Sequence, residues 1–187
     1  LKGVVSASRS KGRHLITSSV EHPAVLEVCD YLERIGYAVT RIPVDEFGMV
    51  DPDDVIRACR ADTALISIMH ANNEVGTIQP VADIAHRARE RGILVHSDAA
   101  QSAGKIRTRV SELGVDLLSL AGHKLYAPKG VGALYVRRGV YLEKQMHGAA
   151  HEQNLRAGTE NVPYIVGFGK ACEIAGRRLE DASRHMR

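Results

Sequence analysis

The sequence lacks the features that mark membrane, nucleic-acid-binding and secreted proteins. None of its apolar runs approaches the roughly 20 residues that span a bilayer. Its formal net charge is only +3, and its Lys and Arg residues are spread along the chain without interleaved aromatics. Only three cysteines are present, far apart and without metal-ligand spacing, and no secretory signal is recognisable. We therefore expect a soluble, cytoplasmic protein with neither a membrane nor a nucleic-acid partner.

The length and the two ends of the sequence bear on its domain organisation. Its 187 residues are enough for one compact domain, and a content of 44% hydrophobic and 25% charged residues is close to the globular average. The sequence begins at Leu1 rather than at a methionine, and residues 169–187 have a helical pattern without a stop signal. We expect residues 1–187 to form one domain that is incomplete at both ends.

Apolar or β-branched runs alternate with amphipathic segments along most of the chain. Residues 23–35 and 80–91 place apolar side chains at helical spacing, with prolines at their starts and glycines after their ends. Strands joined by such helices favour an α/β fold of three αβα layers, with a mostly parallel sheet whose ligands bind beyond the carboxyl ends of the strands. Six strands are predicted, at residues 14–20, 38–44, 64–69, 93–97, 116–120 and 132–136.

Two of the predicted strands end in ionisable side chains. Lys124 follows one strand beside Gly122, and a lysine there can act as a nucleophile, although a surface loop lysine is the alternative. Asp98 closes another strand, and a buried carboxylate needs a partner, either a cation such as the pyridinium nitrogen of pyridoxal phosphate or backbone N–H groups that it caps. One helical stretch and one strand separate the two residues, so we expect them at neighbouring strand ends. Two more polar clusters follow strands, at residues 18–23 and 71–76.

Five segments are informative together: SVEH at 19–22, NNEVG at 72–76, HSDAAQ at 96–101, GHK at 122–124 and RAGTEN at 156–161. In order and spacing they resemble the cysteine desulfurases and the related selenocysteine lyases, members of the class-V aminotransferase group. The resemblance extends from about Lys2 to the C-terminus. It implies a pyridoxal-phosphate enzyme of fold type I, with an aspartate-aminotransferase-like large domain.

The resemblance implies how the cofactor ring would be held. Lys124 would carry the cofactor covalently, and Asp98 would pair with the pyridine nitrogen. Gln101 would approach the phenolic oxygen of the ring, and Ala100 would lie beneath it.

The same resemblance implies roles for four more side chains. His22 would stack on the other ring face and take part in proton transfer, and Asn73 would touch the cofactor oxygen and the substrate carboxylate. His123 would help to hold the phosphate. Thr159 would reach the phosphate of the partner subunit in a homodimer.

The implied reaction converts L-cysteine to L-alanine and passes the sulfur as a persulfide to an acceptor protein. The acceptor is left open, because iron–sulfur cluster assembly, tRNA thiolation and DNA sulfur modification all draw on this chemistry in the family. Selenocysteine lyase activity is the nearest alternative. An aminotransferase or kynureninase relative is another, as is a non-catalytic fragment that only binds the cofactor or dimerises.

The sequence departs from the family pattern in several places. Cys29, Cys59 and Cys172 each follow apolar residues at helical spacing and are predicted to be core residues, so the persulfide-forming cysteine is not expected in this chain. The small C-terminal domain and the N-terminal phosphate loop are also expected to lie outside it. Ala121 stands where many relatives have a phosphate-binding serine, which would weaken cofactor binding by about 1 kcal/mol. Ala149 and Ala150 replace a glycine pair at the expected entrance to the active site, and no metal site is predicted from His70, His96, His147 and His151.

Overall fold

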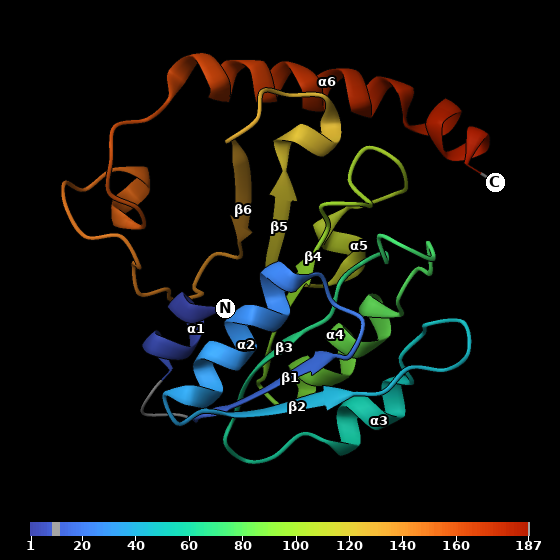
Figure 1. Ribbon diagram of the computed structural model, residues 1–187, viewed down its shortest axis with the longest axis vertical. Helices are drawn as coiled ribbons and strands as arrows, with labels where there is room; N and C mark the ends of the chain where they lie inside the picture. Colours follow the sequence, from blue (N-terminus) through green and yellow to red (C-terminus); the bar gives the residue numbers. More distant parts are fainter. Residues whose placement is uncertain (9–11, 187) are drawn as a thin grey trace.

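The computed structural model describes residues 1–8 and 12–186 and is built on a six-stranded sheet (Figure 1). The strand order is β2-β1-β3-β4-β5-β6, and every neighbouring pair is parallel except β5 and β6. The predicted mostly parallel sheet and its six strands are confirmed, with bounds that differ from the prediction by at most two residues. The strands are β1 (His14–Ser18), β2 (Ala38–Ile42), β3 (Thr63–Ser67), β4 (Leu94–Asp98), β5 (Leu117–Ala121) and β6 (Gly132–Val136).

The helices begin and end where the sequence provides caps. A proline opens α2 and α3, and the side chains of His22 and Asp51 accept a hydrogen bond from an N–H of the first turn of these helices. Gly36 and Gly92 follow α2 and α4 with positive φ, a conformation that glycine adopts without strain. The helices are α1 (Lys2–Ala7), α2 (Pro23–Arg34), α3 (Pro52–Arg57), α4 (Val81–Glu90), α5 (Val110–Leu113), α6 (Val162–His185) and the short 3-10 helices η1 (Gly122–Leu125) and η2 (Glu152–Asn154).

Helices cover both faces of the sheet because alternate strand residues point to opposite sides. On one face α3, α4 and α5 pack against Ile16 and Ile66. On the other face α1 and α2 pack against Leu15 and Leu65. These two clusters confirm the three-layer αβα architecture that the sequence predicted. Neither of the described ranges contains a helix that is both long and apolar enough to cross a membrane.

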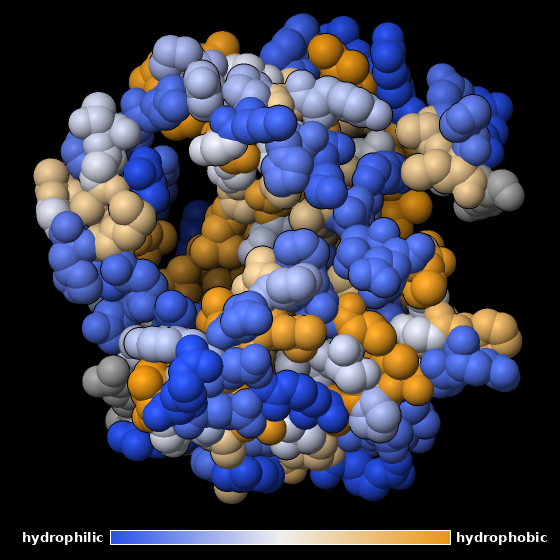
Figure 2. Space-filling view, viewed as in Figure 1, coloured by the Kyte–Doolittle hydropathy of each residue, from blue (hydrophilic) through white to orange (hydrophobic). Residues whose placement is uncertain are grey.

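The helix α6 lies across the end of β5 and β6 and is only partly packed (Figure 1). Its Phe168 and Ala175 contact a third apolar cluster around Leu125 of η1. Figure 2 shows a hollow between β6 and the segment that leads to α6, with apolar residues at its back. The first three residues of β6, from Gly132 to Leu134, are exposed, and Leu134 retains 49% of its accessible surface.

The prediction that all three cysteines are core residues is wrong for Cys172, which is exposed. Cys29 is buried, as predicted, and Cys59 is only partly buried. The spacing identified an apolar face of α6. Within the described residues, Phe168, Ala171 and Ala175 pack against other elements, whereas Cys172 does not. A helical pattern shows which side chains share a face, whereas their burial depends on what packs against that face.

Candidate functional site

The parallel strands direct the polar clusters of the sequence to one edge of the sheet. β1, β3, β4 and β5 are consecutive and parallel, so their carboxyl ends lie side by side (Figure 1). The segments that follow these strands include every residue of the predicted site except Thr159. In parallel sheets ligands bind at this edge, so these residues form the candidate site.

Lys124 lies in η1, directly after β5. Gly122 begins this short helix directly after β5 and lies against Val131, the residue before β6. An added Cβ atom at Gly122 would come within 2.7 Å of the Val131 carbonyl oxygen. Lys124 is partly buried, and its amine makes no hydrogen bond or ion pair with any residue that the structure describes. Its charge lies close enough to Lys105 to lower the pKa of that lysine, although burial of Lys105 contributes more. The amine of Lys124 is thus unpaired within the part of the chain that the structure describes.

Asp98 ends β4, and its register partner is Ser119 in β5. One carboxylate oxygen accepts a 2.8 Å hydrogen bond from the backbone N–H of Ala100. The capping alternative from the sequence is therefore correct in part, but Asp98 caps a turn rather than a helix. As predicted, Asp98 and Lys124 follow neighbouring strands.

Gln101 lies in the turn after Asp98 and already has a partner. Its Oε1 accepts a 2.9 Å hydrogen bond from Lys105 Nζ. Sequence reasoning did not identify Lys105, although a lysine four residues after a glutamine is within reach of it across one turn of chain. Lys105 therefore fixes the amide of Gln101 beside the ends of β4 and β5.

A buried polar bridge joins three strands immediately below this edge. The ring of His96 makes 2.8 Å hydrogen bonds to Ser67 Oγ in β3 and to Ser119 Oγ in β5. Burial lowers the pKa of His96 to about 3, so the ring is neutral. The bridge ties β4 to both neighbours two residues before Asp98.

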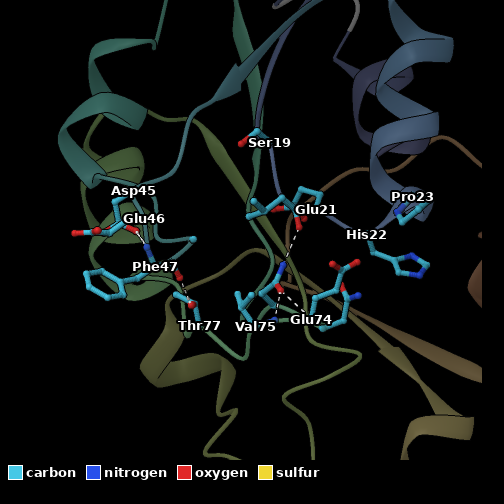
Figure 3. Close-up of a pocket in the computed structure, with 14 residues that line it drawn as sticks. Ser19, Glu21, His22, Pro23, Asp45, Glu46, Phe47, Glu74, Val75 and Thr77 are labelled. Atoms are coloured by element: carbon cyan, nitrogen blue, oxygen red, sulfur yellow. Dashed lines mark hydrogen bonds between the residues drawn. The ribbon is translucent and has the colours of Figure 1, made fainter.

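His22 and Asn73 line one open cavity of about 720 Å³ between three turns (Figure 3). The Nδ1 atom of His22 accepts a 3.1 Å hydrogen bond from Ala24 N, which orients the ring at the start of α2. The neighbouring Asn72 donates to Val20 O at 3.0 Å and so joins the turns that carry His22 and Asn73. The cavity lining does not include the other predicted site residues, which lie at the ends of β4 and β5 or farther along the chain.

Glu21 is buried at the same cavity, and the sequence analysis gave it no role. Its Oε1 accepts hydrogen bonds from Ser18 Oγ at 2.7 Å and from Met69 N at 2.8 Å. Its Oε2 is buried without a partner in the described structure. Burial raises the pKa of Glu21 to about 7. The signal in the sequence was an acidic residue between an apolar run and a proline that opens a helix, which gives its position but not its burial.

The two predicted phosphate ligands are exposed. His123 is the neighbour of Lys124 in η1, and Thr159 lies in the segment between η2 and α6. His151, directly before η2, makes a 2.9 Å contact with Glu160, beside Thr159. The structure thus places His123 next to Lys124 and leaves Thr159 outside the cavity.

Comparison with known proteins agrees with this geometry. A model of the aminotransferase class-V family matches residues 2–186. The chain belongs to the class-V aminotransferase family. Among curated class-V relatives, a cysteine desulfurase IscS of Dictyoglomus turgidum is 56% identical over 175 residues, which are 94% of this chain and 44% of the relative. The chain spans about half the length of the curated relatives it matches.

Solved structures show the same class-V fold. A NifS-like protein superposes with a TM-score of 0.94 at 44% identity, over 99% of this chain and 51% of its own. A structure described as SspA in complex with cysteine superposes with a TM-score of 0.88 at 46% identity, over 92% of this chain and 50% of its own. The backbone of this chain therefore has the class-V fold.

Proposed function

We propose that this chain is the pyridoxal-phosphate-binding large domain of a cysteine desulfurase, which converts L-cysteine to L-alanine and passes the sulfur to an acceptor protein. The observation that carries the proposal is the placement of Lys124 and Asp98 on neighbouring strand ends, with the lysine amine unpaired among the described residues. A curated relative is named as a cysteine desulfurase, and a solved neighbour is described with cysteine bound.

The donor set at the strand ends fits pyridoxal phosphate. The free amine of Lys124 can bond to an aldehyde, and the carboxylate of Asp98 can hold a proton on a pyridine nitrogen. The buried bridge through His96 keeps the strands that carry them in register. When bound, the cofactor supplies an electron sink for negative charge that develops at the substrate Cα.

The proposed roles of the chain's own residues follow from this placement. Lys124 holds the cofactor and, once displaced by the substrate amine, accepts the proton from the substrate Cα. His22 would face the cofactor ring and assist proton transfer, and Asn73, which lines the same cavity, would contact the substrate carboxylate. Asp98 would maintain the charge at the ring nitrogen, and Gln101, whose amide oxygen Lys105 holds, would help to bind the ring.

The phosphate and the partner subunit complete the proposal. His123 holds the phosphate beside Lys124, and Thr159 serves the site of the second subunit in a homodimer. The uncovered apolar surface along α6 and β6 supports an association of this kind. The three unpaired cysteines are consistent with the proposed cytoplasmic location.

The sulfur is proposed to leave through a cysteine that this chain does not supply. Burial raises the pKa of Cys29 to about 11, so its thiol is not a ready nucleophile. Burial also raises the pKa of Cys172, whose helix lies outside the cavity lining. An added thiol should therefore be needed for turnover.

The test is covalent attachment of pyridoxal phosphate at a single lysine. The chain is incubated with the cofactor, its visible absorbance is recorded, and borohydride reduction is followed by mass mapping. Lys124→Ala should abolish the absorbance band and the mapped adduct, whereas the control Lys129→Ala, which removes a nearby exposed lysine, should retain both. Labelling spread over surface lysines, unchanged in Lys124→Ala, would contradict the proposal. Alanine release from L-cysteine with added thiol then tests the reaction.

A further inference from the structure

Glu21 connects two of the strand ends that form the site. It follows β1 and precedes His22, the residue that caps α2. Its carboxyl group reaches across to the end of β3, where it accepts the N–H of Met69 at 2.8 Å. The turn that carries His22 is therefore tied to the end of β3 through this side chain, in addition to the hydrogen bond that Asn72 donates to Val20 O.

The hydrogen bonds of Glu21 are distributed unequally between its two oxygens. Ser18 Oγ and Met69 N both donate to Oε1, while Oε2 is buried without a described partner. A buried, unpartnered carboxylate oxygen carries a large desolvation penalty when ionised. A proton on Oε2 removes that charge and leaves both hydrogen bonds to Oε1 intact.

We propose that Glu21 is a positioning residue that acts as a neutral carboxylic acid, holding the His22 turn against β3 while the negative charge of the site stays on Asp98. The consequence for His22 and Asp98 rests on the proposed function. The protonation state of Glu21 does not depend on it, because it follows from contacts within the chain.

The charges around Glu21 support the neutral form. Asp98 raises the pKa of Glu21 further, in addition to the larger effect of burial. Glu21 in turn contributes to the raised pKa of Cys29 in α2. Among the remaining surroundings, His22, Asp45, Glu46 and Glu74 line the same cavity. The buried His70 follows Met69, and burial lowers its pKa. None of these groups supplies a cation that pairs with Glu21 in the described structure.

The test compares Glu21→Gln, Glu21→Ala and the control Glu27→Gln, an exposed glutamate of α2, by urea unfolding between pH 4.5 and 8. The native state keeps the Glu21 proton up to a pKa of about 7, whereas the ordinary value is 4.5. The stabilising contribution is therefore complete below the ordinary value and is lost as the pH rises through about 7. The folded-to-unfolded ratio of the wild type, relative to Glu21→Gln, should fall toward a limit of about 300-fold across this range. The ratio relative to Glu27→Gln should not show this fall.

The positioning role has its own readout. Glutamine can accept both hydrogen bonds, so Glu21→Gln should keep the hydrogen-exchange protection of the Met69 amide and the cofactor attachment at Lys124. Glu21→Ala should lose both. A glutamine variant that behaves like alanine, or a wild-type ratio that stays constant with pH, would overturn the proposal. If the wild type does not attach the cofactor, the proposed function fails, while the pH and exchange measurements still decide the state of Glu21.

Discussion

Lowering the pH from 7 to 5 should destabilise the sheet through His96. This side chain lies in the middle of β3, β4 and β5 and retains only 5% of its accessible surface. Both ring nitrogens are used by the hydroxyl groups of Ser67 and Ser119. Burial lowers its pKa from 6.5 to about 3, so the folded protein does not take up a proton here at pH 5.

The magnitude follows from proton linkage. Below pH 6.5 the unfolded chain binds a proton at His96 that the folded chain excludes, so stability decreases as the pH falls. Between pH 7 and pH 5 this difference amounts to about 2 kcal/mol of unfolding free energy. The loss continues until the pH approaches the folded value of about 3. Glu21 acts in the opposite direction over part of this range, so the total slope of the wild type does not isolate His96.

The measurement that isolates it is a comparison with His96→Gln, whose side chain stays neutral at every pH. Urea unfolding at pH 7 and pH 5 gives the stability gap between the wild type and the variant at each pH. The gap should shrink by about 2 kcal/mol at pH 5. The control His86→Gln replaces an exposed histidine of α4. The stability difference between the wild type and this control should be the same at pH 7 and pH 5. A His96→Gln gap that is equal at both pH values would refute the argument, because the ring would then titrate alike in both states.

Three other changes test the site and the fold. Gly122→Ala should cost about 1–3 kcal/mol of unfolding free energy and reduce cofactor attachment, since the new Cβ would lie 2.7 Å from the carbonyl oxygen and 2.9 Å from Cγ1 of Val131; urea unfolding and adduct mapping measure both effects. Asp98→Ala should retain cofactor attachment but lower alanine release by on the order of 100-fold, measured with added thiol, and unchanged release would count against the assigned role. In alkylation followed by mass mapping, Cys172 should react in the folded protein and Cys29 only after unfolding, because one is exposed and the other is buried with a pKa raised to about 11.

Most of the fold could be predicted because its signals are local. The β-branched and apolar runs are short, and each is bounded by a proline, a glycine or a capping side chain that ends one element and starts the next. The alternation of strands and helices then restricts the sheet to mostly parallel pairing. Spacing alone could not show that β6 turns back antiparallel to β5, because that depends on the short connection after η1.

The positions of the candidate residues at strand ends were predictable, but their contacts were not. Lys124 and Asp98 could be located because each follows an apolar strand, where parallel topology gathers polar groups. The acceptor role of Gln101 toward Lys105 and the burial of Glu21 could not be read from the sequence. Both depend on turns whose conformation is set by tertiary contacts. The burial of Cys172 was mispredicted because the helical pattern of α6 does not show which other elements pack against it.

Hydrogen bonds inside the sheet help to set the relative positions of Asp98 and Lys124. A sheet held only by apolar packing tolerates small shifts between layers, whereas a side-chain bridge across strands fixes which residues stand opposite one another. His96 provides such a bridge for β3, β4 and β5, and His14 provides a second one between Thr40 in β2 and Thr63 in β3. The pairing of Asp98 with Ser119 then sets the offset between the carboxylate and the helix that carries Lys124. Burial lowers the pKa of both bridging histidines, which disfavours a buried charge inside the sheet, so the bridges can hold the strand register while Asp98 and Lys124 lie at the carboxyl-end edge.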